Sequence, residues 1–309
     1  MKTIHFSLLV CILLLSACNA PASTPTVEST STSSPAPLPD ATSTSTPIPT
    51  STPIPTETQA PAPLFFSPII YGRKFDKTAF ILLGGTEGDV WLSPEITVAR
   101  FADSLDYDVH TFPNGIVQIT GNAPEFSPTC KSYFVGTDAT VEGTGMIGVA
   151  KGWQVTQRNA EELSPDNRFY QQTVIDWLKT EGIPSPQFDI LRVFRVDIEG
   201  DGVDEIFINA SHLDESQHTT KAGDYSVVLM RKVVGNDAVT LPIAGDVYHS
   251  QELEITFPLT YSLANFMDLN QDGILEVVVD IQKWEGFGAI VYQIDDQDVI
   301  QTLRAVCPQ

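Results

Sequence analysis

Two acidic segments in the second half of the chain combine carboxylates and glycines at a shared spacing. The first is VDIEGDGVDEIF, Val196 to Phe207, and the second is MDLNQDGILEVV, Met267 to Val278. Aligned on the first aspartate of each, both have oxygen-bearing side chains at positions 1, 3, 5 and 9 and a glycine at position 6. These side chains are Asp197, Glu199, Asp201 and Glu205 in the first loop, and Asp268, Asn270, Asp272 and Glu276 in the second.

This spacing suits a hard cation. Oxygens at every second position of a tight loop can converge on one point, and the glycine permits the turn that brings position 9 back. Ca²⁺ takes about 6–8 oxygen ligands, which four side chains, a water and the position 7 carbonyl (Val203 or Ile274) can supply. Without a cation the carboxylates would repel one another. The sequence therefore predicts a calcium site in each loop, structural rather than regulatory; the alternative is a pair of metal-free acidic turns.

The pattern D-x-[DNE]-x-D-G-x-x-E resembles the calcium loops of FG-GAP and VCBS-type repeats, as found in integrin-like β-propellers. An EF-hand would need a bidentate glutamate at position 12, where this chain has Ile208 and Val279. The resemblance implies that position 9 closes each loop and that strands flank it. Glu199 is longer than the usual Asp or Asn, so it would bind through a water or not at all. Two copies are too few for a full propeller.

The residues around the loops predict strands. Each loop joins two apolar β-type runs and is followed by a further strand, so the chain contains two copies of one unit about 71 residues apart, counted from Asp197 to Asp268. Earlier runs, including TAFILLGG at 78–85 and EITVARF at 95–101, also predict strands. The turn Pro113-Asn114-Gly115 predicts a hairpin between two more.

One amphipathic helix interrupts this β pattern. It is expected to start at Ser164-Pro165 and to run to Gly182, with an apolar face that packs on a sheet. The expected fold class is therefore mainly β (α+β): an antiparallel β-sheet domain with one prominent helix and two DxDxDG-type calcium loops joining strands. The resemblance extends to uncharacterised bacterial lipoproteins with a similar C-terminal half, which implies no particular activity.

The N-terminus predicts export and lipidation. Lys2 precedes an apolar stretch from Phe6 to Leu15, which is too short for a membrane span of about 20 residues. The stretch ends in Leu15-Ser16-Ala17-Cys18, which resembles a bacterial lipobox. We therefore expect residues 1–17 to be a signal peptide and Cys18 to carry the lipid that anchors the chain to the extracytoplasmic face of the cell membrane. An ordinary secretion signal is the alternative.

Residues 18–64 form a low-complexity segment. It contains 11 of the 22 prolines and is otherwise nearly all Ser, Thr and Ala, a composition that cannot bury enough apolar area to fold. We expect a disordered, extended stalk. The remaining chain is expected to divide into a β-rich part, 65–160, and a part with the helix and the duplicated calcium-loop units, 161–309. Two cysteines remain there, Cys130 and Cys307; a disulfide is favoured in an exported domain, and two buried thiols are the alternative.

The chain's net charge of −22 disfavours nucleic acid and anionic lipid head groups as partners. Motifs of serine hydrolases, zinc proteases and CxxC redox proteins are absent from the sequence. His212 and His218 lie six residues apart in a polar loop, which is not a recognised zinc pattern. We therefore expect a non-enzymatic, calcium-stabilised surface lipoprotein that binds an unknown protein or polysaccharide; an exported hydrolase acting on a cell-surface polymer is the alternative.

Overall fold

The computed structural model describes residues 65–307, except for 75–77, 102, 114, 215–218, 251–256 and 285. The predicted signal peptide, Cys18 and the predicted stalk lie outside the described residues, as does His218. The chain divides into two units, Met1–Gln59 and Ala60–Gln309, and the description concerns the second. None of its described helices is both long enough and apolar enough to cross a membrane.

The first sheet uses the strands up to residue 150. Its strand order is β5-β4-β8-β1-β2-β7-β6, with β3 paired to β2, and all its pairs are antiparallel. The strands are β1 (Ser67–Lys74), β2 (Thr78–Glu87), β3 (Val90–Leu92), β4 (Leu105–Phe112), β5 (Gly115–Gly121), β6 (Glu125–Ser127), β7 (Ser132–Val135) and β8 (Thr144–Ala150).

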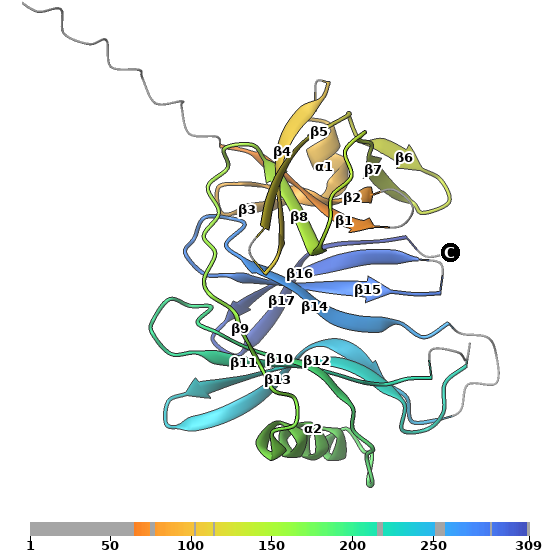
Figure 1. Ribbon diagram of the computed structural model, residues 1–309, viewed down its shortest axis with the longest axis vertical. Coiled ribbons are helices and arrows are strands. Elements are labelled where there is room, and N and C mark those ends of the chain that lie inside the picture. Colours follow the sequence, from red (N-terminus) through yellow and green to blue (C-terminus); the bar gives the residue numbers. More distant parts are fainter. Residues whose placement is uncertain are drawn as a thin grey trace, which may run out of the picture. The chain divides into compact units, whose positions relative to one another are not determined.

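Two further antiparallel sheets follow in the chain. The second sheet has the order β13-β12-β11-β10-β9 and the third has the order β14-β15-β16-β17. Their strands are β9 (Glu161–Leu163), β10 (Ile190–Val196), β11 (Glu205–His212), β12 (Tyr225–Val234), β13 (Asp237–Val247), β14 (Thr260–Met267), β15 (Glu276–Gln282), β16 (Phe287–Asp295) and β17 (Asp298–Val306). The expected mainly β fold is confirmed, and the sheets form stacked layers rather than propeller blades around an axis (Figure 1).

The third sheet lies between the other two and is buried on both faces (Figure 1). Along β15, Val277 and Val279 pack into one cluster with Phe194 and Phe207 of the second sheet. Val278, which points the opposite way, packs with Ile69 and other residues of the first sheet. Double burial explains why this strand reads as a continuous apolar run instead of an alternating one.

The internal duplication is longer than the sequence indicates. Strands β10–β13 form one antiparallel meander and β14–β17 form another, so each repeat has four strands. In each repeat an acidic loop joins the first strand to the second. The strands flanking the loops therefore agree with the prediction, and the fourth strand of each unit completes it.

Two sequence expectations need correction. The segment Glu95–Phe101 does not form a strand, because Ser93 and Pro94 start the short helix α1 (Pro94–Val98). The prominent helix, α2 (Arg168–Thr180), starts later than expected: its N-cap is Asn167, whose Oδ1 accepts a hydrogen bond from the Phe169 amide at 2.9 Å. As predicted, the apolar side of α2 packs on a sheet, with buried Val174 and Leu178 against the second sheet.

A disulfide joins the first and third sheets. Cys130 lies in the loop between β6 and β7, and Cys307 follows the last strand, with a Cα–Cα distance of 4.4 Å and a sequence separation of 177 residues. Both cysteines are buried. The structure thus has the bridged alternative rather than two free thiols.

Candidate metal centre

The two acidic loops occupy equivalent places in their repeats. The first lies between β10 and β11, the second lies between β14 and β15, and their closing acids, Glu205 and Glu276, begin the following strands. The position 6 glycines, Gly202 and Gly273, have φ angles of +88° and +90°. Other residues rarely adopt this conformation, so the turn requires glycine.

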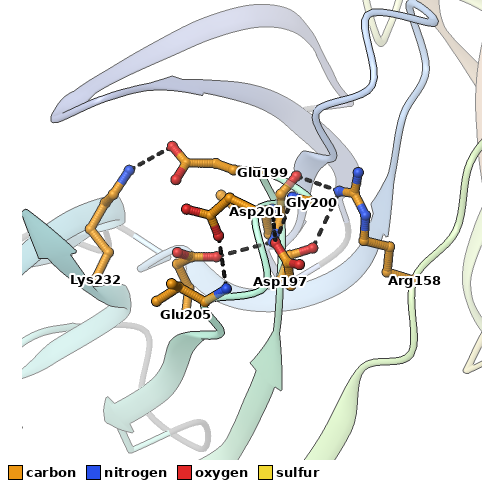
Figure 2. A network of polar contacts seen from close by, with 9 residues as sticks. Arg158, Asp197, Glu199, Gly200, Asp201, Glu205 and Lys232 are labelled. Atoms are coloured by element: carbon orange, nitrogen blue, oxygen red, sulfur yellow. Dashed lines mark hydrogen bonds and ion pairs between the residues drawn. The ribbon is translucent and has the colours of Figure 1, made fainter. Parts of the chain in front are cut away.

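In the first loop, Asp197 organises the backbone. Its Oδ1 accepts hydrogen bonds from the amides of Gly200 (2.5 Å) and Asp201 (3.2 Å), and its Oδ2 accepts one from Gly202 (2.9 Å). Asp201 Oδ1 accepts a bond from the Val203 amide at 2.8 Å. Figure 2 shows that these acidic side chains gather around the inside of the turn.

The second loop repeats this arrangement. Asp268 Oδ2 accepts a hydrogen bond from the Gly273 amide at 3.1 Å, and Asp272 Oδ1 accepts one from the Ile274 amide at 2.8 Å. Asn270 Oδ1 accepts a bond from the Asp272 amide at 3.1 Å. Sequences that differ at positions 2, 3, 4, 7 and 8 therefore form the same turn, because the shared aspartates and glycine specify it.

The closing acid reaches back across each loop to position 2. Glu205 Oε2 accepts a hydrogen bond from the Ile198 amide at 3.0 Å, and Glu276 Oε2 accepts one from the Leu269 amide at 2.7 Å. Burial is the main cause that raises the pKa of Glu205 to about 7 and that of Glu276 to about 8. Position 9, not position 12, thus closes each loop.

The second loop contains two buried oxygen atoms without a hydrogen-bond partner. They are Oδ1 of Asp268 and Oε1 of Glu276, whose residues are 3% and 0% exposed. A buried carboxylate oxygen without a donor is costly, and a cation is one way to compensate it. The donor set, all oxygen, also matches the preference of Ca²⁺. The chemistry of the residues in the second loop therefore suits a calcium ion.

The full ligand set does not converge. Within the described part of the chain, no group of three or more His, Cys, Asp or Glu side chains is placed to hold a metal ion. That group counts only these four residue types. It therefore leaves out two proposed ligands of the second loop, the Asn270 side chain and the Ile274 carbonyl. Asp272 Oδ2 accepts hydrogen bonds from Asn270 Nδ2 (2.9 Å) and Gln293 Nε2 (3.1 Å). The turn and the closing acid are therefore preformed, and Asp272 would have to exchange these bonds for a metal.

In the first loop, the side chain of Glu199 forms an ion pair with a residue outside the loop. Its Oε1 pairs with Nζ of Lys232 at 2.7 Å, and Lys232 is only 4% exposed (Figure 2). The carboxylate at position 3 is thus already paired with a positive charge, the ammonium group of Lys232 in β12. This agrees with the sequence interpretation of Glu199 as the least regular of the ligands.

The sequence did not identify Arg158, which joins the two loops. Its Nη1 donates hydrogen bonds to the carbonyls of Asp197 (3.2 Å) and Ile198 (2.6 Å), and its Nη2 donates one to Gly273 (2.6 Å). The loops also meet directly, because the Leu275 amide donates to the Ile198 carbonyl at 2.8 Å. Arg158 precedes the repeats, and a lone arginine far from both loops in sequence gives no signal of this role.

Replacing Arg158 with methionine should destabilise the domain by about 2–3 kcal/mol, because hydrogen bonds from a charged donor contribute about 1.5–3 kcal/mol and this side chain is half-buried. Arg158→Lys should recover less than half of the loss, since one ammonium cannot span three carbonyls in the geometry of a guanidinium. Urea unfolding in chelator measures both variants. Arg100→Met, which removes an arginine paired with Glu87, is the control, and an equal loss there would contradict the assigned role.

Among the described residues outside the two loops, no group of His, Cys, Asp and Glu side chains forms a second centre of this kind. His212 Nδ1 pairs with Asp189 at 3.1 Å. Asp280 is buried in a pocket lined by residues of all three sheets, where it accepts a 2.5 Å hydrogen bond from the Tyr71 hydroxyl. It is the one carboxylate among the described residues that line this pocket, whereas a glycosidase requires two.

Comparisons with known proteins add no assignment: the chain matches no protein-family model, no curated protein and no solved structure.

Proposed function

We propose that this chain is a lipid-anchored extracytoplasmic protein whose folded domain binds calcium and serves as a binding module for a protein or polysaccharide. The observation that carries the proposal is the pair of buried, unpartnered oxygens of Asp268 and Glu276. Both belong to a turn whose backbone the loop's own aspartates already organise. The ion would complete the second loop and add to the stability of the layer between the other two sheets.

The first loop is proposed as a weaker site of the same kind. Its position 1, 5, 7 and 9 ligands would be Asp197, Asp201, the Val203 carbonyl and Glu205, while Glu199 is held by Lys232. Each oxygen of Asp197 already accepts at least one amide hydrogen bond. The first loop therefore has fewer carboxylate oxygens without a partner that could bind an ion than the second loop has.

The lipobox-like sequence ending at Cys18 and the disulfide support the proposed location. A lipid on Cys18 would hold the domain outside the cytoplasm, where calcium is abundant and disulfides persist. The Pro/Ser/Thr-rich segment would extend the domain away from the membrane. The acidic surface favours partners without strong negative charge. A pull-down from native cell envelope with the chain beginning at Asn19 would identify the partner.

The calcium proposal predicts a stability difference between calcium and chelator. Ligand at about 100 times its Kd adds about 2.7 kcal/mol, which corresponds to a Tm increase of about 5–10 °C for a domain of this size. Calorimetric unfolding of the chain beginning at Asn19, with millimolar calcium or with EDTA, measures this shift. Magnesium is the control, because it requires stricter octahedral geometry and should stabilise less. Equal Tm values, together with no heat of calcium binding, would contradict the proposal.

A further inference from the structure

The third strand of each repeat places one side chain beside its acidic loop. In the first repeat Ile206 pairs with Arg231, and in the second Val277 pairs with Tyr292. Lys232 and Gln293 are the next residues along β12 and β16, directly after Arg231 and Tyr292. Lys232 and Gln293 are therefore structurally equivalent, although no sequence motif marks either of them.

Both side chains donate a hydrogen bond to a loop carboxylate. Lys232 Nζ donates to Glu199 Oε1 at 2.7 Å, and Gln293 Nε2 donates to Asp272 Oδ2 at 3.1 Å. Lys232 thus contacts position 3 of its loop and Gln293 contacts position 5, and the donor carries a positive charge in the first repeat and none in the second. Lys232 is 4% exposed, so water screens its charge little.

The loops also differ in the burial and the pairing of their carboxylates, since Asp268 is buried and Asp197 is only half-buried. The loop beside the neutral Gln293 contains the two buried oxygens that have no partner. The loop beside Lys232 has no such atom among its described residues, and its position 3 acid is paired. An ammonium next to a loop compensates the carboxylates and repels a second cation, whereas an amide does neither.

We infer that the residue at this position of the third strand determines how strongly each loop binds calcium. Lys232 acts as an internal cation that weakens metal binding at the first loop. Gln293 leaves the negative charge of the second loop for the metal. This inference rests on the proposed calcium binding and assigns a specificity-determining role to two residues outside the ligand sets.

A reciprocal exchange of the two residues tests the inference by calcium titration calorimetry. Lys232→Gln should strengthen binding at the first loop by at least about tenfold, because calcium affinity follows the charge of the site. This is measured in a Glu276→Gln background, so that the second loop does not contribute. Gln293→Lys, in the otherwise natural chain, should weaken binding at the second loop by a similar factor. Circular dichroism and urea unfolding confirm that each variant is folded.

Neutral variants separate charge from hydrogen bonding. Lys232→Met should strengthen calcium binding at the first loop as Lys232→Gln does, because both remove the positive charge. Gln293→Met should leave the affinity of the second loop within about twofold, because it changes no charge. These methionine variants also test the inference if Gln293→Lys fails to fold. Unchanged affinity in Lys232→Gln and Lys232→Met, with normal binding by the natural chain, would overturn the inference alone. Absence of any calcium binding by the natural chain would instead overturn the proposed function.

Discussion

Glu276→Gln should abolish most of the calcium-dependent stability of the domain while leaving the domain folded. The residue is 0% exposed, and one of its carboxylate oxygens accepts the Leu269 amide at 2.7 Å while the other has no partner. A glutamine can keep the bond from Leu269 through its carbonyl oxygen, but it supplies neither the negative charge nor the bidentate carboxylate that the ion would use. The variant therefore removes the metal ligand with little change in shape.

The effect should differ in sign between the two conditions. In chelator at a pH above about 8, where Glu276 is ionised, Glu276→Gln should be as stable as the natural chain or more stable, because it no longer buries an uncompensated carboxylate. In calcium it should lack most of the gain of about 2.7 kcal/mol expected at 100 times the Kd. Calorimetric unfolding of both proteins in both conditions measures this crossover.

Two controls make the result specific. Glu142→Gln changes an exposed acid that pairs with Lys74 and should leave the calcium effect intact. Glu205→Gln changes the closing acid of the first loop and should reduce the calcium effect less than Glu276→Gln does. If Glu276→Gln kept the full calcium-dependent Tm shift, the second loop would not be the calcium site.

The second large effect is expected at the disulfide. Cys130→Ala combined with Cys307→Ala should lower the free energy of unfolding by about 2–5 kcal/mol, the usual cost of removing a native disulfide. The bridge closes a loop of 177 residues, for which chain entropy alone gives about 5 kcal/mol. The bridge also holds Cys307, the residue after β17, against the first sheet. The Cys307 amide donates a hydrogen bond to the Phe287 carbonyl at 2.8 Å.

Unfolding in urea with and without reductant measures this contribution. Reductant should destabilise the natural chain to the level of the double alanine variant, and it should not affect the variant. Each single alanine variant should be as unstable as the double one, because either removes the covalent link. A natural chain that unfolds at the same urea concentration with and without reductant would show that the bridge contributes nothing.

Local features of the sequence were sufficient for the acidic loops and most strands. The position 6 glycines require a positive φ, and the aspartates at positions 1 and 5 satisfy the amides of the turn within a few residues. Interactions this short in range are visible in a spacing pattern. The segment Glu95–Phe101 was interpreted wrongly because its alternation of apolar and polar residues outweighed the capping signal of Ser93 and Pro94.

The sequence by itself determined the acidic-loop pattern, the position of the closing acids and the mainly β class. It left open whether Cys130 and Cys307 are bridged or are two buried thiols, and the structure shows the bridge. The tertiary structure decided what surrounds the loops. Arg158 contacts Gly273 across 115 residues of sequence, and Lys232 and Gln293 are equivalent only through strand register. These contacts follow from how sheets pair and stack, and such long-range packing leaves no periodic signal in the chain.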